Sequence, residues 1–237
     1  MPTIAELLAP FQEYPPDPSG EHYLKFHIRR FQALLEDVAE VLANCGPAPR
    51  ILDVGLAYQT ICMLKCFPQA TVRTAGFYDC RFNHWLTVDN HTQVDLNDTK
   101  FPEKVQPGVP EYDVVVLAEV IEHLYVPAKP VLEHLKQWLK PGGTLILQTP
   151  NPVSLGKRVA AMRGVNPFEM IREDPTNPGH YCEFRVQDIR AAVESAGFTV
   201  TTVRTRNYFG RKSPLYDALC AILPGSLHDG ITVMARK

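Results

Sequence analysis

Short apolar runs alternate along the chain with segments whose apolar residues recur at helical spacing. The runs predict strands at 51–54, 72–77, 114–118 and 144–149, and a weaker strand at 92–96. The recurrence of Val131, Leu135 and Leu139 predicts a connecting helix, which the Pro141-Gly142-Gly143 turn is expected to end. Strands that alternate with helices are typical of a parallel sheet covered by helices on both faces.

The amino-terminal part of the chain differs from this pattern. Residues 1–20 are rich in proline and are expected to form an arm or lid after one short helix, without contributing to a core. An amphipathic helix is predicted over 21–43, with Phe31 on its apolar face and Arg30 and Asp37 away from that face. This helix is therefore expected to pack on an apolar surface.

The carboxyl-terminal third is predicted to complete the sheet. A helix at 186–196 precedes one apolar run at 198–205, and a second run follows at 231–236. The two runs are expected to pair as antiparallel strands at the sheet edge. The predicted organisation is an amino-terminal arm and helix at 1–47 and one α/β domain at 48–237. Two lid-like insertions are expected within that domain, at 150–182 and 207–228.

Composition places the chain among ordinary globular proteins. Its 237 residues suit one domain with additions, and 45% of them are hydrophobic and 21% charged. The net charge of −2 gives no overall attraction to a polyanion, which argues against nucleic acid as a partner. We expect a cytoplasmic protein with reduced thiols, because the sequence indicates no signal peptide, no membrane span and no paired CxxC spacing among its six cysteines.

The first predicted strand runs directly into Asp53-Val54-Gly55. A tight turn here would present backbone N–H groups at the carboxyl edge of the sheet, where such folds bind nucleotide-type cofactors. The triplet by itself is equally typical of an ordinary turn between a strand and a helix. Its meaning therefore depends on the segments that follow.

Three segments together resemble class I S-adenosylmethionine-dependent methyltransferases in order and spacing: ILDVG at 51–55, YDVVVLAEVIEHL at 112–124 and LKPGGTLILQTPNP at 139–152. The resemblance implies a doubly wound α/β fold with a mostly parallel seven-stranded sheet whose last strand is antiparallel. It also implies S-adenosylmethionine as the cofactor.

The same resemblance assigns eight positions to the cofactor site. Asp53 and Gly55 would lie under the methionine part of the cofactor, an acidic residue after the second strand would bind the ribose, and Asp95 would lie near the adenine. The full set is Asp53, Gly55, Ala57, Asp79, Asp95, Leu96, Ala118 and Glu119.

Two features depart from the family pattern. Ala57 and Gln59 stand where the second and third glycines of the family's turn fall, which leaves the backbone less room to approach a cofactor. Tyr78 stands where the ribose-binding acid is expected, and Asp79 follows it. The first departure keeps open an alternative, a methyltransferase-like binding module without catalysis. A nicotinamide-dependent oxidoreductase is disfavoured, because the turn lacks the G-x-G-x-x-G pattern.

Glu119, Glu122 and His123 follow the fourth strand at spacings that would place them on one face of a helix starting there. Two carboxylates and an imidazole suit Mg²⁺, Mn²⁺ or Fe²⁺ better than a thiolate-rich zinc site. The EVIEH segment, with TPN and the later His180, is similar to metal-dependent small-RNA 2′-O-methyltransferases, and E-x-x-E-H resembles a feature of ubiquinone-pathway O-methyltransferases. The resemblance implies a divalent cation, Mg²⁺ or Mn²⁺, held by Glu119, Glu122, His123 and His180.

EVIEHL also occurs in methyltransferases without a metal, where Glu119 lines the cofactor pocket and His123 packs locally. In that case His123 or His180 would be the catalytic base that takes a proton from an acceptor hydroxyl. We expect the acceptor hydroxyl on a small molecule, a glycan or a lipid precursor.

The stretch from 166 to 184 is long enough to cover the catalytic edge of the sheet. Its residues Arg172, Glu173 and Tyr181 are candidate contacts of the acceptor. They are equally compatible with a solvated loop whose aromatic side chains pack beneath it.

Overall fold

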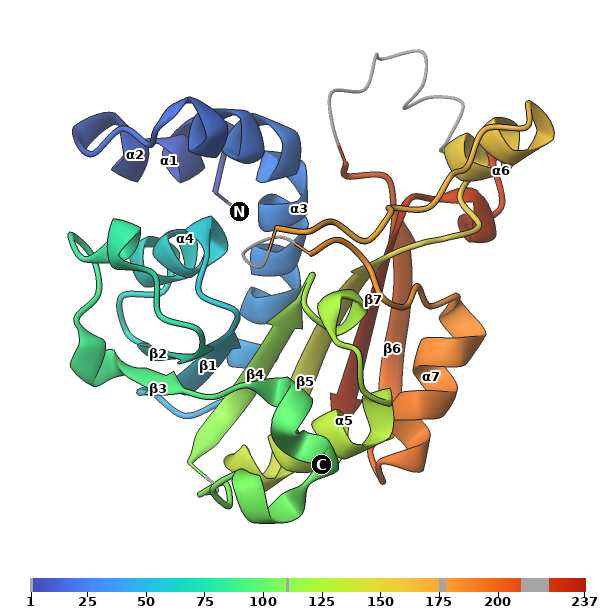
Figure 1. Ribbon diagram of the computed structural model, residues 1–237. Helices are drawn as coiled ribbons and strands as arrows, with labels where there is room; N and C mark the ends of the chain where they lie inside the picture. The colour runs from blue at the N-terminus through green and yellow to red at the C-terminus, as the bar shows by residue number, and fades with distance from the viewer. Residues whose placement is uncertain (1, 110, 175–177, 210–221) are drawn as a thin grey trace.

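The computed structural model describes residues 2–109, 111–174, 178–209 and 222–237. In this part of the chain seven strands form one sheet in the order β3-β2-β1-β4-β5-β7-β6 (Figure 1). The strands are β1 (Arg50–Val54), β2 (Thr71–Gly76), β3 (His91–Gln93), β4 (Tyr112–Ala118), β5 (Leu139–Pro150), β6 (Thr199–Arg206) and β7 (Gly230–Arg236). β7 pairs antiparallel with both neighbours, and the other pairs are parallel. The predicted fold class and all seven predicted strands are confirmed.

Helices cover both faces of the sheet, with α3 and α4 on one face and α5 and α7 on the other (Figure 1). The helices are α1 (Ile4–Leu8), α2 (Pro10–Glu13), α3 (Pro18–Leu42), α4 (Tyr58–Cys66), α5 (Ala128–Trp138), α6 (Leu155–Met162) and α7 (Val186–Ser195). Short 3₁₀ segments near the site are η1 (Cys80–Phe82), η3 (Leu96–Lys100) and η5 (Ile121–His123). The predicted insertion at 150–182 contains the helix α6.

The helix α5 ends earlier than its sequence pattern predicts. Trp138 is its last residue, and Leu139 already pairs with Tyr112 at the start of β5. The Pro141-Gly142-Gly143 turn lies inside that strand, where Gly142 has a φ of 77°. The prediction that this turn ends the helix is wrong, because pairing with β4 begins before the turn is reached.

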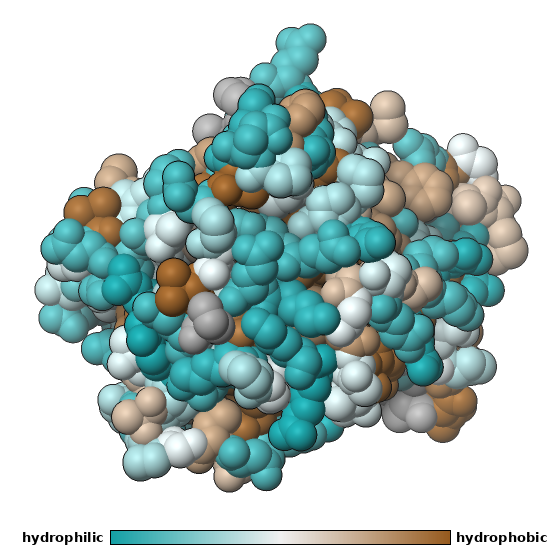
Figure 2. All heavy atoms as spheres, turned by 90° about the horizontal axis from the view of Figure 1, so that it is seen from below, coloured by the Kyte–Doolittle hydropathy of each residue, from teal (hydrophilic) through white to brown (hydrophobic). Residues whose placement is uncertain are grey.

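The two poles of the sheet differ in what covers them. The carboxyl ends of the parallel strands lie on the side of α1, α3 and α6 (Figure 1), whereas hydrophilic residues predominate on the opposite pole (Figure 2).

Among the described helices, none combines the length and apolar character needed to cross a membrane. Five cysteines in the described chain are free, as expected, whereas Cys220 and most of the predicted insertion at 207–228 lie outside it.

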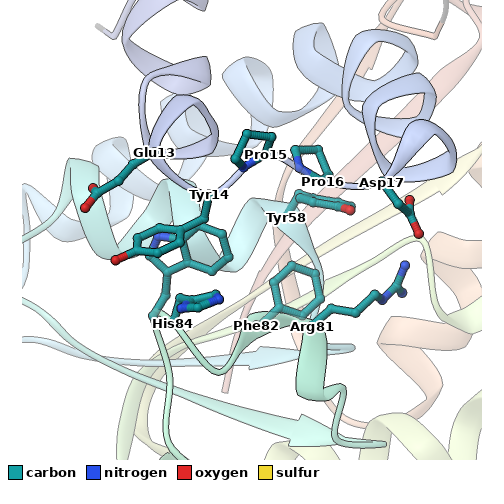
Figure 3. A pocket seen from close by; sticks show the side chains of 10 residues that line it. Glu13, Tyr14, Pro15, Pro16, Asp17, Tyr58, Arg81, Phe82 and His84 are labelled. Atoms are coloured by element: carbon teal, nitrogen blue, oxygen red, sulfur yellow. The ribbon is translucent and has the colours of Figure 1, made fainter.

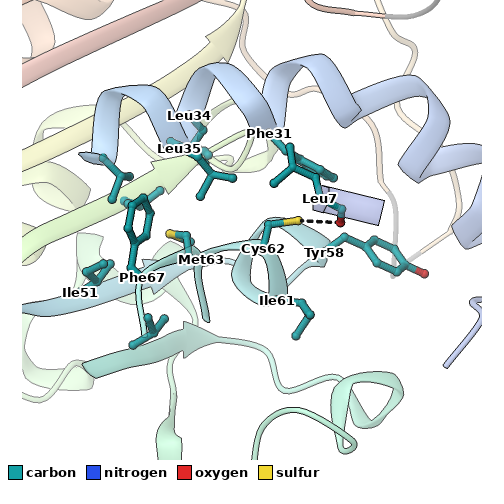
Figure 4. Packing of buried hydrophobic residues seen from close by; sticks show 14 of the residues in the cluster. Leu7, Phe31, Leu34, Leu35, Ile51, Tyr58, Ile61, Cys62, Met63 and Phe67 are labelled. Carbon is teal, nitrogen blue, oxygen red and sulfur yellow. Dashed lines mark hydrogen bonds between the residues drawn. The ribbon is translucent and has the colours of Figure 1, made fainter. Parts of the chain in front are cut away.

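Residues 1–20 contribute to the core, contrary to the sequence prediction. Leu7 of α1 and Phe11 of α2 are 1% and 6% exposed and pack against α3 and α4. Thr3 caps α1, and the Cys62 thiol donates a hydrogen bond to the Leu7 carbonyl at 3.8 Å (Figure 4). Burying a side chain of this size contributes about 1.5–3 kcal/mol, so two of them fasten the arm to the domain.

Two charged residues of α3 are buried although the helical pattern places them away from the apolar face. Asp37 accepts hydrogen bonds from Arg204 and from Arg206 of β6, with the Arg206 contacts at 2.6 and 2.8 Å. Arg30 donates to His27 at 3.2 Å. Ion pairs compensate Asp37 for the loss of water, and hydrogen bonds compensate Arg30 in part; apolar periodicity reports neither.

Candidate active site

The turn after β1 has a backbone conformation that requires glycine at position 55. Gly55 has a φ of 93°, and its N–H donates to the carbonyl of Ala75 at 2.9 Å. A Cβ at this position would lie 2.6 Å from Cγ2 of Val120, so glycine is required for space as well as for φ. Ala57, in contrast, has a φ of −154°, an extended conformation that any residue adopts. The first departure from the family pattern therefore introduces no backbone strain.

Asp53 lies beneath this turn in a buried hydrogen-bonded group. The Thr60 hydroxyl donates to Oδ2 of Asp53 at 2.5 Å, and the Gln59 side chain donates to the Gly55 carbonyl at 3.2 Å. Oδ1 of Asp53 is buried without a partner. Burial raises the pKa of Asp53 to about 7, although the Thr60 hydrogen bond opposes the shift. A buried carboxylate with an oxygen to spare suits a cationic ligand group.

The predicted ribose and adenine contacts lie along the same edge, after β2 and β3. Asp79 caps η1 and accepts hydrogen bonds from the Arg81 side chain at 2.6 and 2.8 Å and from its backbone N–H at 2.9 Å. Asp95 caps η3, and Leu96 and Ala118 are buried. A nucleoside at this edge would have to use the remaining lone pairs of carboxylates that already have partners.

An aromatic cavity of about 420 Å³ borders this region, between the amino-terminal arm and η1 (Figure 3). Its wall includes Tyr58, which follows the predicted cofactor residue Ala57, and Arg81, which pairs with Asp79. The other lining residues are Glu13, Tyr14, Pro15, Pro16, Asp17, Phe82, His84 and Trp85. Two predicted cofactor positions thus adjoin the wall of a cavity that the sequence did not indicate.

Glu119 directly follows β4 in a left-handed conformation with a φ of 57°, which is uncommon for a residue other than glycine. Its N–H donates to the Gln148 carbonyl at 2.9 Å and so extends the pairing between β4 and β5. The helix that would place Glu119, Glu122 and His123 on one face does not form, because a 3₁₀ segment begins only at Ile121. Sheet pairing holds Glu119 out of helical geometry, so the predicted shared helix face is wrong.

Glu119 and Glu122 are both buried carboxyl groups. Burial raises the pKa of Glu119 to about 7, against the opposing charge of Arg30. Burial and then the charge of Glu119 raise the pKa of Glu122 well above its usual value. Glu122 accepts a hydrogen bond from the Thr149 hydroxyl at 3.1 Å, whereas Oε1 of each glutamate is buried without a partner. A cation between them would relieve both the burial of charge and the repulsion.

The loop that follows α6 carries His180 to this place. The carbonyl of Glu122 accepts the backbone N–H of Tyr181 at 2.8 Å, and the carbonyl of Gly179 lies 2.8 Å from Nδ1 of His123. The His123 and His180 rings lie 4.9 Å apart between centroids. Hydrogen bonds on both sides of His180, one to the backbone and one to a side chain of η5, thus fix the loop against η5.

Three of the four predicted metal ligands come together. Glu122, His123 and His180 each offer one ligand atom, and these atoms lie within 4.8 Å of one another. Metal bonds of about 2.0–2.2 Å place ligand atoms up to about 4.4 Å apart, so a slight closure would admit an ion. Nδ1 of His180 lies 3.1 Å from Oε1 of Glu183, and its Nε2 lies 3.6 Å from Oε2 of Glu169, so carboxylates hold this ring on both sides. Glu119 lies outside this set.

A cavity of about 600 Å³ opens beside these groups. Its polar and charged lining comprises His27, Glu119, His123, Ser154, Lys157, Glu169, Arg172, His180 and Asp229. Tyr23, Phe26 and Phe209 supply an aromatic side, with the two phenylalanine rings 6.1 Å apart. The cavity therefore presents an apolar wall and a polar wall to one ligand.

Of the three residues predicted to contact the acceptor, Arg172, Glu173 and Tyr181, only Arg172 lines this cavity. Arg172 lines the cavity and pairs with Glu169 at 3.2 Å. The Tyr181 ring packs against Tyr125, with centroids 5.7 Å apart, and Glu173 is exposed. Of the three, the structure brings Arg172 to the cavity lining.

The helix α3 supplies a buried group that the sequence analysis missed. Arg30 donates to His27 at 3.2 Å and to the Tyr23 hydroxyl at 3.4 Å, and its Nη1 is buried without a partner. Burial, followed by the charge of Arg30, lowers the pKa of His27 to about 2, so this imidazole is neutral. Tyr23, His27 and Arg30 are spaced by one helical turn each, and this polar and aromatic stripe was the available signal.

Comparison with known proteins assigns the family. Residues 26–203 match the family model described as a methyltransferase domain, so the chain belongs to this family and is an S-adenosylmethionine-dependent methyltransferase. A malonyl-[acyl-carrier protein] O-methyltransferase of Halalkalibacterium halodurans is 31% identical over 134 residues, covering 53% of this chain and 49% of that protein. The chain thus spans about half the length of this curated relative.

Solved structures share the fold. A SAM-dependent methyltransferase from Archaeoglobus fulgidus has a TM-score of 0.57 at 15% identity, over 88% of this chain and 94% of that one. A putative S-adenosylmethionine-dependent methyltransferase from Listeria monocytogenes has a TM-score of 0.58 at 14% identity, over 88% and 98%. At these identities the likeness concerns the fold, and it agrees with the strand order described above.

Proposed function

We propose that this methyltransferase methylates an oxygen atom of a small molecule, glycan or lipid precursor bound in the cavity of about 600 Å³. The observation that carries the proposal is that both His123 and His180 line this cavity. Nδ1 of His123 faces the Gly179 carbonyl, so its Nε2 is left to accept a proton or bind an ion, whereas His180 lies between two carboxylates, with Nδ1 3.1 Å from Glu183 and Nε2 3.6 Å from Glu169. Such groups are what a hydroxyl acceptor needs.

The methionine end of the cofactor would lie between the β1 turn and Glu119. When bound, S-adenosylmethionine supplies a methyl group activated by its positive sulfonium. Oδ1 of Asp53 and Oε1 of Glu119 would face its cationic groups, and Nη1 of Arg30 would face its carboxylate. The support for this arrangement is that all three atoms are buried without partners.

A divalent cation would be held by Glu122, His123 and His180. There it would hold the acceptor oxygen and make it a better nucleophile. Support comes from the 4.8 Å grouping of the ligand atoms and from the hydrogen bonds that fix both imidazoles. In this arrangement Glu119 serves the cofactor rather than the ion, and without an ion His123 or His180 would be the base.

The lining of the cavity narrows the class of acceptor. Phe26 and Phe209 suit an apolar body, and Lys157 and Arg172, which pair with Glu183 and Glu169, could also contact an anionic group. The curated relative is an O-methyltransferase of malonyl-[acyl-carrier protein], which supports oxygen as the accepting atom. An acyl thioester with a free carboxylate is therefore included among the acceptors to test.

The test is a methyl-transfer screen with methyl-labelled S-adenosylmethionine. Dihydroxy aromatics, hydroxylated lipids, glycans and a malonyl thioester would be offered beside amine and thiol acceptors, and products would be identified by mass spectrometry. We expect label on oxygen of an acceptor with an apolar body. Label found on nitrogen or sulfur acceptors, with none on oxygen, would overturn the proposal.

A further inference from the structure

The cavity of about 600 Å³, here called the acceptor cavity, has a histidine on its aromatic side. His27 of α3 lines the cavity together with Tyr23 and Phe209. Its ring lies 4.1 Å from the Tyr23 ring and 5.7 Å from the Phe209 ring between centroids. This imidazole is therefore a polar group in a mainly aromatic wall, and neither the candidate metal site nor the cofactor contacts described above use it.

The tautomer of His27 is set by Arg30. A guanidinium carries only donors, so the Nε–H of Arg30, at 3.2 Å from Nδ1 of His27, requires a lone pair on that nitrogen. A neutral imidazole with a lone pair on Nδ1 carries its proton on Nε2. Burial and then the charge of Arg30 lower the pKa of His27 to about 2, so the ring keeps this form at neutral pH.

The Nε2–H of His27 is left for a ligand. Arg30 is fully buried, so the Nδ1 edge of the ring faces the protein interior. Among the described residues none accepts a hydrogen bond from Nε2, and the ring is partly exposed where it lines the cavity. The aromatic side of the acceptor cavity therefore presents an oriented N–H donor.

His123 presents the opposite tautomer to the same cavity. Its Nδ1 lies 2.8 Å from the carbonyl of Gly179, which can only accept, so the neutral ring carries its proton on Nδ1 and a lone pair on Nε2. One cavity thus combines a donor at His27 with an acceptor at His123. The two rings together suit a molecule with an oxygen lone pair at one position and an O–H group at another.

We infer that His27 selects the methyl acceptor by donating its Nε2–H to a carbonyl oxygen on the apolar body of that molecule. The hydroxyl that receives the methyl group is a second oxygen, which faces the polar side of the cavity. A carbonyl oxygen accepts hydrogen bonds without donating any, as the N–H of His27 requires, and a flat group suits a wall of rings. The inference names the acceptor class within the proposed function and rests on it.

The test compares phenols that carry an acetyl group with phenols that carry an ethyl group at the same ring position. The two compounds of each pair differ at one place, where the acetyl group has a carbonyl oxygen. Transfer from methyl-labelled S-adenosylmethionine gives kcat/KM for each compound. The ratio of kcat/KM for the two compounds is then compared between variants, which cancels the difference in acidity between the phenols.

We expect His27→Phe to reduce the preference for the acetyl compound about fivefold, which is the effect of one hydrogen bond. His27→Gln should keep the preference, because glutamine can accept from Arg30 through Oε1 and donate to the ligand through Nε2. His22→Phe, at an exposed position of the same helix, is the matched control and should also keep it. Circular dichroism would verify the fold of the three variants.

Nitrogen NMR of the parent chain with isotope-labelled histidine tests the donor without any substitution. We expect the Nε2–H tautomer at His27, and a shift of its Nε2 signal by the acetyl compound but not by the ethyl compound. The Nδ1–H tautomer, no such shift, or an unchanged preference in His27→Phe would overturn the inference. A loss of affinity for S-adenosylhomocysteine of more than about threefold in His27→Phe would also overturn it, because His27 would then serve the cofactor. A shift at Nε2 without any methylated oxygen would instead contradict the proposed function alone.

Discussion

The Thr60 hydroxyl lies 2.5 Å from Oδ2 of Asp53, while Oδ1 of the same carboxylate is buried without a partner. One oxygen is thus fixed by the helix α4, and we propose that the other binds the cationic end of the cofactor. We expect Asp53→Asn to lower the affinity for S-adenosylhomocysteine at least tenfold, or about 1.4 kcal/mol, because the ligand's ammonium loses a charged acceptor. Thr60→Val should have a smaller effect, since it removes only the orienting bond. Isothermal titration calorimetry measures both.

Asp98→Asn is the matched control for this prediction, because Asp98 is a partly exposed acid that lies 4.0 Å from Lys104. It should leave the affinity unchanged. Equal affinities of the parent chain and Asp53→Asn would place the cofactor's cationic end elsewhere.

The raised pKa of Asp53 predicts a pH dependence of stability in the absence of ligand. Its pKa is about 7 in the folded chain against 3.8 as the ordinary value, because burial disfavours the charge. The folded state therefore holds a proton that the unfolded state releases, and stability is lost as the pH rises from about 4 to about 7. Asp53→Asn removes this loss, so its melting temperature should gain on that of the parent chain as the pH rises from about 4 to about 7, and the gain should then stay constant.

Thermal melts at several pH values test this directly. Asp79→Asn is the control, because Arg81 holds the pKa of Asp79 low despite its partial burial, and its removal should show no gain over this range. A constant difference between the parent chain and Asp53→Asn at all pH values would contradict the assignment.

Gly55 and Ala57 are expected to respond in opposite ways to substitution. Gly55→Ala forces a φ of 93° on alanine and brings its Cβ to 2.6 Å from Val120, so it should destabilise the fold by about 1–3 kcal/mol and weaken cofactor binding. Ala57→Gly should change the affinity for S-adenosylhomocysteine less than about threefold, because the backbone at 57 is already extended. Melting temperatures of the two variants test the predicted stabilities, and calorimetric titration tests the predicted affinities for S-adenosylhomocysteine.

Adding Val120→Ala to Gly55→Ala should recover part of the lost stability, because it relieves the contact but not the backbone strain. A large gain in affinity from Ala57→Gly would mean that the methyl group of Ala57 obstructs the cofactor.

The sheet could be predicted from the sequence because each buried strand leaves a short apolar run, and a run such as 114–118 reports burial directly. The burial of Leu7 could not be predicted, since proline-rich composition suggests an arm and does not report what α1 packs against. The burial of Arg30 was not predicted for a related reason. In a hydropathy pattern, an arginine that is buried and hydrogen-bonded to His27 and Tyr23 looks the same as a solvated one.

The proximity of Glu122, His123 and His180 could be predicted from the sequence, whereas their geometry could not. Glu122 and His180 are far apart in sequence, and the resemblance to known methyltransferases, rather than spacing, linked them. The left-handed φ of Glu119 depends on its pairing with Gln148 of β5, a tertiary contact that local spacing does not report. The orientation of His180 depends on Glu183, which no motif indicated.

The grouping of Glu122, His123 and His180 predicts that a divalent cation is needed for methyl transfer but not for cofactor binding. Purification without chelator should give metal at stoichiometric amounts by elemental analysis. EDTA should abolish transfer to an accepted hydroxyl and leave the affinity for S-adenosylhomocysteine nearly intact, because the ion would hold the acceptor rather than the sulfonium. His180→Ala should imitate EDTA, since it removes one ligand of a small set.

Two further variants separate a bound ion from a direct base. Glu183→Gln keeps the ring of His180 in place but weakens the hydrogen bond that orients it, so it should lower metal affinity by about 10–100-fold, and excess Mn²⁺ should restore transfer. His22→Ala, on the exposed face of α3, is the control and should behave like the parent chain. Rescue by excess metal is not expected of a base. Undiminished transfer in EDTA, with no metal at stoichiometric occupancy, would therefore reject the ion and leave His123 or His180 to take the proton directly.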